Sequence, residues 1–144
     1  MTAFLFANCG GPLDKLASLL QAFHVEDARS IASKTVLIVD DDEEIRHVLR
    51  LLFEAERMQV IGEAANGVEA VPLALNHQPD FVILDLRLPQ LDGESAAEIL
   101  RAVVPGTKIV AFSAFLEQRP LWADAYLNKD RITELMPLLR SFIR

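Results

Sequence analysis

Cysteine is nearly absent from this sequence, which has Cys9 alone among its 144 residues. One cysteine cannot form a disulfide within the chain, so a disulfide-stapled fold is excluded and a reducing compartment is favoured. No apolar run approaches the roughly 20 residues that a membrane-spanning helix needs. The apolar start, Ala3 to Ala7, is too short for a signal-peptide core, and no basic residue precedes it. We therefore expect a cytoplasmic protein with no membrane partner.

Basic residues are also scarce. Lysine and arginine number 14 against 21 aspartates and glutamates, so the formal net charge is -7. Nucleic-acid surfaces are built from clustered cations, so this balance argues against a DNA or RNA partner. It leaves the binding of metal cations open. Hydrophobic residues make up 51% of the chain, which is enough for the core of one compact domain.

The first 34 residues differ in pattern from the remainder. We predict an N-terminal extension over residues 1–34 and one folded domain over residues 35–144. Leu13, Leu16, Leu20 and Phe23 recur at helical spacing, which predicts an amphipathic helix over about 12–24. The polar residues from 24 to 34 are expected to connect this helix to the domain.

From residue 35 onward, strands and helices are expected to alternate. Helices are expected between the strands, with Asp42 capping the first helix and Asp130 capping the last. The pattern predicts an α/β fold with a doubly wound, five-stranded parallel sheet and helices on both faces. Short apolar runs predict the strands at 36–39, 58–64, 81–84, 108–112 and 125–128. The first helix is predicted to carry one apolar stripe, formed by Ile45, Val48, Leu49, Leu52 and Phe53.

Reactive side chains follow four of the predicted strands. Asp40 and Asp41 end the first strand, Asp85 the third, Ser113 the fourth and Lys129 the fifth. In doubly wound sheets, functional sites lie at the carboxyl ends of the strands, so these groups should meet at one edge. Three clustered carboxylates repel one another and suit Mg2+, and a carboxylate beside a cation can act as nucleophile toward a phosphoryl group.

Each of these residues has an ordinary explanation when it is taken alone. The aspartates could be helix caps or turn residues, and Ser113 and Lys129 could be surface residues. Their placement together at successive strand ends is what favours a site.

Residues 35–143 resemble the receiver domain of bacterial two-component response regulators, which has a flavodoxin-like fold. The resemblance is carried by four segments: Val36 to Asp42, Pro79 to Pro89 with Asp92 and Gly93, Phe112 to Ala114, and Ala125 to Asp130.

The resemblance implies a phosphorylation site that uses Mg2+. Asp85 would be the phosphoacceptor. Asp41, Asp85 and the main-chain carbonyl of Arg87 would bind the Mg2+ directly, and Asp40 would act through a bound water. Lys129 would pair with the phosphoryl group.

The resemblance also implies a switch and its partners. Ser113 would move to bond the phosphoryl group, and Tyr126 would turn inward as Ser113 moves. The phosphodonor would be a histidine kinase, and the output would be binding of a downstream protein partner. Such a domain is not an enzyme in the usual sense, since it phosphorylates itself from a phosphohistidine donor, with slow autodephosphorylation.

Two features depart from the family pattern. Ser113 and Lys129 are only 16 positions apart, which is shorter than in typical receivers, so the fourth helix is expected to be one turn or absent. Pro120 limits it further. Arg87 lies two residues past Asp85, where it would alter the lifetime of the phosphoryl group or pair with an acid of the pocket.

A shortened fourth helix should uncover apolar surface on one side of the sheet, and contact of that surface with water is unfavourable. We expect the N-terminal extension to cover it, either within one chain or across a homodimer. The homodimer is slightly favoured, because the connector from His24 to Lys34 is long enough to reach a neighbour.

Four alternative functions can be weighed against the sequence. A phosphorelay shuttle would use the same pocket, whereas a constitutive pseudo-receiver is disfavoured by the intact pocket and is kept open only by the shortened segment between Ser113 and Lys129. A flavodoxin-like electron carrier would need a glycine- and hydroxyl-rich phosphate loop where Asp40 to Glu44 stand. An aspartyl phosphatase would need a second acid at the position of Arg87.

Overall fold

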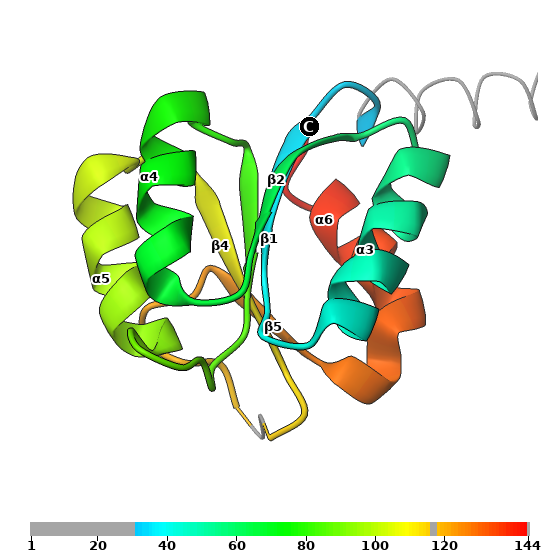
Figure 1. The fold of residues 1–144 in the computed structure, drawn as a ribbon. Coiled ribbons are helices and arrows are strands. Elements are labelled where there is room, and N and C mark those ends of the chain that lie inside the picture. Colours follow the sequence, from blue (N-terminus) through cyan, green and yellow to red (C-terminus); the bar gives the residue numbers. More distant parts are fainter. Residues whose placement is uncertain (1–30, 116–117, 144) are drawn as a thin grey trace, which may run out of the picture.

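The computed structural model describes residues 31–115 and 118–143, which form a five-stranded parallel sheet with the strand order β2-β1-β3-β4-β5 (Figure 1). The elements in chain order are β1 (Thr35–Val39), α3 (Glu43–Ala55), β2 (Gln59–Ala64), α4 (Gly67–His77), β3 (Phe81–Leu84), α5 (Gly93–Val103), β4 (Lys108–Ser113), β5 (Ala125–Asn128), the 3-10 helix η1 (Lys129–Glu134) and α6 (Leu135–Arg140). The predicted fold class is therefore confirmed, and the five strands lie where the apolar runs placed them.

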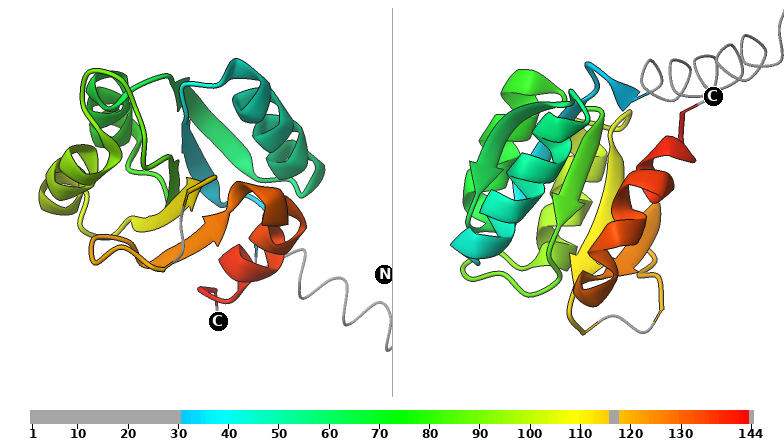
Figure 2. Two further views of the ribbon diagram at one scale, coloured as in Figure 1. Left: turned by 90° about the horizontal axis from the view of Figure 1, so that it is seen from below. Right: turned by 90° about the vertical axis from the view of Figure 1, so that its right-hand side faces the viewer.

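Helices cover both faces of the sheet. Helices α3 and α6 lie on one face, and α4 and α5 lie on the other (Figures 1 and 2). Each face has its own apolar cluster, because alternate residues of a strand point to opposite sides. Phe53 of α3 and Leu139 of α6 belong to the first cluster, whereas Ala70 of α4 and Leu100 of α5 belong to the second.

Side-chain caps fix the start of three helices at the same edge of the sheet. Asp42, Asn66 and Asp92 each accept a hydrogen bond from a backbone N–H in the first turn of α3, α4 and α5. Such a cap satisfies an N–H that has no partner inside its helix. The cap predicted at Asp42 is therefore confirmed.

The last helix begins later than predicted, and Asp130 does not cap it. Residues Lys129–Glu134 form a 3-10 segment with Arg131 outside the helical region, and α6 begins at Leu135. Pro137 gives the reason. Its ring removes an N–H and crowds the carbonyl four residues earlier, so a regular α-helix is tolerated only when proline lies in its first turn.

No helix joins β4 to β5 within the described residues 114–115 and 118–124. We call residues 118–124 the strap. Trp122 of the strap packs on Ala111 of β4, which is fully buried. The guanidinium of Arg101 on α5 donates to the carbonyl of Trp122 at 2.9 Å and to the carboxylate of Asp124 at 2.7 Å. A cation on the neighbouring helix thus holds the strap against the sheet.

Replacing Arg101 by alanine should loosen this strap. The carboxylate of Asp124 and the carbonyl of Trp122 would both lose a charged donor, and such hydrogen bonds contribute roughly 1–2 kcal/mol at partly exposed sites. We expect Arg101→Ala to lower the free energy of unfolding by about that amount in urea melts. Arg131→Ala is the control, because the ion pair of Arg131 with Glu134 is on the surface and its loss should leave the melt unchanged.

The extension predicted for residues 1–34 lies almost entirely outside the described residues, as does its expected helix over 12–24. Its last part is described, and Ile31 is fully buried in the apolar cluster on the α3 and α6 face. The backbone N–H of Ser33 donates to the carbonyl of Arg57 at 2.9 Å. Among the described residues, no helix is both long and apolar enough to cross a membrane.

Candidate functional site

Backbone pairing carries Asp40 and Asp85 just past the ends of their strands. The N–H of Asp40 donates to the carbonyl of Ala64, and the N–H of Asp85 donates to the carbonyl of Val39, both at 3.0 Å. These bonds continue the sheet for one residue beyond β1 and β3. The backbone of both residues is therefore fixed by the sheet itself.

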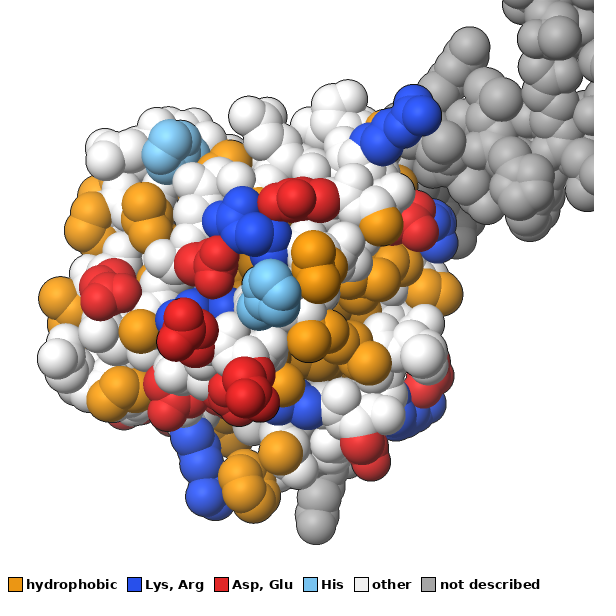
Figure 3. Space-filling view, turned by 45° about the vertical axis from the view of Figure 1, so that its right-hand side comes forward, with side chains coloured by type: hydrophobic (Ala, Val, Ile, Leu, Met, Phe, Trp, Pro, Cys, Tyr) orange, Lys and Arg blue, Asp and Glu red, His pale blue; other side chains and the backbone are white. Residues whose placement is uncertain are grey.

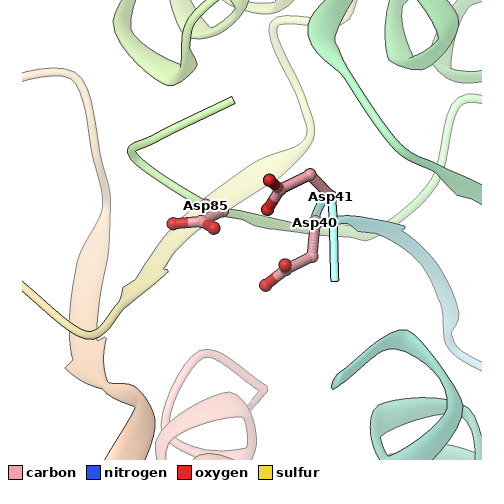
Figure 4. Close-up of side chains that lie close together, drawn as sticks. All are labelled: Asp40, Asp41 and Asp85. Carbon is pink, nitrogen blue, oxygen red and sulfur yellow. The ribbon is translucent and has the colours of Figure 1, made fainter. Parts of the chain in front are cut away.

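Three carboxylates meet at this edge. Asp40, Asp41 and Asp85 each offer an oxygen atom, and these atoms lie within 4.8 Å of one another (Figure 4). Asp40 and Asp85 are only 2% and 5% exposed, whereas Asp41 is exposed. Two desolvated acids beside an open one form a set of hard oxygen donors that suits a divalent cation such as Mg2+.

Lys129 bridges the two buried acids. Its Nζ lies 2.7 Å from Oδ2 of Asp40 and 3.1 Å from Oδ2 of Asp85. One ammonium therefore serves two carboxylates.

This sharing explains the direction of the pKa shifts. Burial raises the pKa of Asp40 above its ordinary value, and the charge of Asp85 adds to that rise, although hydrogen bonds from Lys129 and from the backbone of Asp42 oppose it. Burial also opposes the charged form of Lys129, but the two carboxylates outweigh that effect and raise the pKa of Lys129. The pocket is thus short of positive charge, which a bound cation would supply.

An open cavity of about 490 Å3 lies over the acids. Ser113, which is 1% exposed, lies on its wall at the end of β4. The cavity is lined by Asp41, Asp42, Asp85, Arg87, Ser113, Ala114, Phe115 and Lys129. A phosphoryl-sized group could therefore reach the Asp85 carboxylate, the Ser113 hydroxyl and the Lys129 ammonium from one side.

Arg87 makes a contact that was not foreseen. Its guanidinium carbon lies 3.9 Å from the centre of the Phe115 ring, which is cation–π geometry. One of the two expectations for Arg87 was an ion pair with an acid of the pocket. Among the described residues, no such ion pair is found. The stack connects the loop after β3 to the loop after β4. Arg87 lies two residues past Asp85, and Phe115 lies two residues past Ser113 on the adjacent strand. This equal spacing is the sequence feature that could have predicted their contact.

Tyr126 lies outside the acidic pocket. It is 39% exposed and lines a separate groove of about 420 Å3 with Arg131 and Glu134. The structure thus brings together Asp40, Asp41, Asp85, Arg87, Ser113 and Lys129 from the set chosen by sequence, and leaves Tyr126 apart from them.

Comparison with known proteins supplies the family context. The family described as the response regulator receiver domain matches residues 36–129. The transcriptional regulatory protein PdtaR of Mycobacterium tuberculosis is 38% identical over 119 residues, which cover 78% of this chain and 58% of PdtaR. The chemotaxis protein CheY of Halobacterium salinarum is 33% identical over 103 residues, which cover 67% of this chain and 85% of CheY.

A solved structure agrees with the sequence relatives. The CheX–CheY complex of Borrelia burgdorferi with BeF3 and Mg2+ contains a chain that is 28% identical, with a TM-score of 0.71; the match covers 82% of this chain and 99% of that one. The match to PdtaR spans little more than half of that protein's length, so the similarity concerns one domain and not the whole of that relative.

Proposed function

Because this chain belongs to the response regulator receiver domain family, we propose that it accepts a phosphoryl group on Asp85 from a histidine kinase and thereby switches the binding of a protein partner. The observation that carries the proposal is the position of Lys129, whose ammonium contacts both Asp85 and Asp40 beside the open carboxylate of Asp41.

The proposed reaction is an in-line phosphoryl transfer. A carboxylate oxygen of Asp85 attacks the phosphorus of a phosphohistidine and forms a P–O bond, while the P–N bond breaks. The electron pair of that bond stays on the imidazole, which takes a proton from solvent. The product on this chain is an acyl phosphate.

The pocket residues would stabilise the transferred group. Asp41, Asp85 and the main-chain carbonyl of Arg87 would hold Mg2+, with Asp40 acting through a water molecule. The ion would neutralise charge on the phosphoryl oxygens. Lys129 would pair with one of those oxygens, and the hydroxyl of Ser113 would donate to another. The complex of a relative with BeF3 and Mg2+ supports this cofactor.

The proposed output is a conformational switch. The acyl phosphate carries about 1.5 to 2 negative charges in place of the single charge of the Asp85 carboxylate, and its new oxygens would draw the hydroxyl of Ser113 inward. Tyr126 would then turn from its present half-exposed position toward the space that Ser113 leaves. The domain would act on its partner by binding, so no second substrate is needed.

The proposal is tested with a small phosphodonor. The full chain is incubated with acetyl phosphate and Mg2+, and its intact mass is measured. We expect the mass of one phosphoryl group to appear with Mg2+ and to be absent when a chelator is present. A chain that gains no mass with Mg2+ would contradict the phosphoacceptor role and leave the constitutive pseudo-receiver as the better description.

Asp41 and Asp40 should differ in their effect on metal binding. In wild type, free Mg2+ at ten times its Kd should stabilise the fold by about 1.4 kcal/mol. Asp41→Ala should lose this gain, because Asp41 is expected to touch the ion, and Asp40→Ala should keep part of it. Thermal melts against Mg2+ concentration measure both, with Asp130→Ala as a control outside the carboxylate cluster. Equal losses in the two variants would remove the distinction between direct and water-mediated ligands.

A further inference from the structure

An apolar strip runs along the outer side of α3. Val48 is 46% exposed and Leu51 is 55% exposed, although Val48 belongs to the apolar stripe predicted for this helix. Figure 3 shows hydrophobic side chains gathered on this face of the molecule. A shallow hollow of about 490 Å3 lies at the first turns of the helix, lined by Glu43, Glu44, His47 and Val48. Exposed apolar side chains that adjoin one another commonly mark a surface that something covers.

The chain enters the domain next to this strip. Ile31 is fully buried in the cluster that holds Leu49 and Phe53 of α3. Ser33 is bonded to the carbonyl of Arg57, which follows the end of α3 by two residues. The segment that precedes residue 31 therefore leaves the core at the C-terminal end of α3 and on the same face of the sheet.

We propose that residues 12–24 of the same chain pack as an amphipathic helix along the exposed strip of α3. Leu13, Leu16, Leu20 and Phe23 supply one apolar face at helical spacing. Residues 13–23 as a helix would be about 16 Å long, which fits the roughly 20 Å length of α3.

The anchor point also favours one direction. Residues 24–30 can span at most about 23 Å, which is close to the roughly 20 Å length of α3, so an antiparallel segment would need this connector to be almost fully extended. A segment that runs parallel to α3, with Phe23 near the C-terminal end of that helix, needs only a short turn. In this arrangement Leu20 would lie beside Leu51, and Leu13 and Leu16 would lie toward Val48 and the hollow.

The same geometry disfavours the surface that the sequence suggested for the extension. The strap is on the other face of the sheet, and there Trp122 already covers Ala111. A tethered segment also has an effective concentration in the millimolar range, so the chain's own segment outcompetes that of a second copy at micromolar protein.

Engineered cysteines test the packing directly. In a Cys9→Ser background, the pair Leu20→Cys and Leu51→Cys should form a disulfide within one chain under mild oxidation. The control pair combines Leu20→Cys with Leu75→Cys, because Leu75 is similarly exposed at 46% but lies on α4, across the sheet. Intact mass and non-reducing gels should show the first pair closing on the order of tenfold faster. Equal rates, or disulfide-linked dimers in place of closed monomers, would overturn the proposal.

Amide hydrogen exchange of the full chain gives a second readout. Leu16→Asp should speed exchange in α3 several-fold and leave α4 and α5 unchanged. Ser18→Asp is the matched control, because Ser18 lies on the opposite side of the predicted helix. No change in α3 with Leu16→Asp would count against the packing. Neither experiment depends on phosphorylation, so failure here is separate from failure of the proposed chemistry at Asp85.

Discussion

Asp85→Asn is expected to take up no phosphoryl group from acetyl phosphate in the presence of Mg2+. An amide has no charged oxygen with which to attack phosphorus, so labelling should be lost completely and not merely slowed. The two remaining carboxylates, Asp40 and Asp41, lie on the neighbouring strand end and are not expected to substitute. Intact mass after incubation reads the result directly.

Asp92→Asn is the matched control for this substitution. It makes the same chemical change at an exposed aspartate that caps α5 through its side chain, and asparagine caps helices about as well as aspartate. This variant should label like wild type. Labelling of Asp85→Asn at the wild-type level would show that another residue accepts the phosphoryl group.

Gly93→Ala should damage both the fold and the labelling. A Cβ at Gly93 would collide with the carbonyl oxygen of Asp85 and lie 2.9 Å from Cα of Leu86. Both are backbone atoms, so the loop after β3 must shift to make room. Overpacking of this kind costs roughly 1–3 kcal/mol and occasionally more. Displacement of Asp85 should also slow phosphoryl transfer, because that step depends on alignment.

Urea melts and labelling rates measure the two effects of Gly93→Ala. Gly106→Ala makes the same substitution where a Cβ would meet no atom within 4 Å. It should label normally and melt at the wild-type urea concentration or slightly above it. A Gly93→Ala protein that matches Gly106→Ala in both measurements would show that the loop accommodates the methyl group.

Most of the fold and the position of the pocket could be predicted from the sequence. The three central strands, β1, β3 and β4, are buried on both sides, so each appears as a nearly continuous apolar run, as at Phe81–Leu84. The groups that end such runs must converge at one sheet edge, and this places Asp40, Asp85 and Lys129 together whatever the details of the loops.

What could not be predicted depends on contacts between segments far apart in sequence. Val48 fits the helical stripe of α3, yet it is 46% exposed, because spacing along one helix does not show how far a neighbouring element extends over it. The stack of Arg87 on Phe115 joins two loops. Arg101 holds the strap through the carbonyl of Trp122, which lies 21 positions further along the chain. Neither the composition nor the periodicity of the sequence predicts any of these three features.

The single ammonium in the pocket has a consequence for the valence of the ion that can bind there. Three ionised carboxylates with one lysine leave two uncompensated negative charges, so a divalent cation brings the cluster to neutrality. Sodium or potassium would leave a buried net charge, which the low dielectric of the interior makes costly. A trivalent ion would leave the cluster with a net positive charge. We therefore expect the charge of Lys129 to make the cluster prefer a divalent ion over a monovalent one.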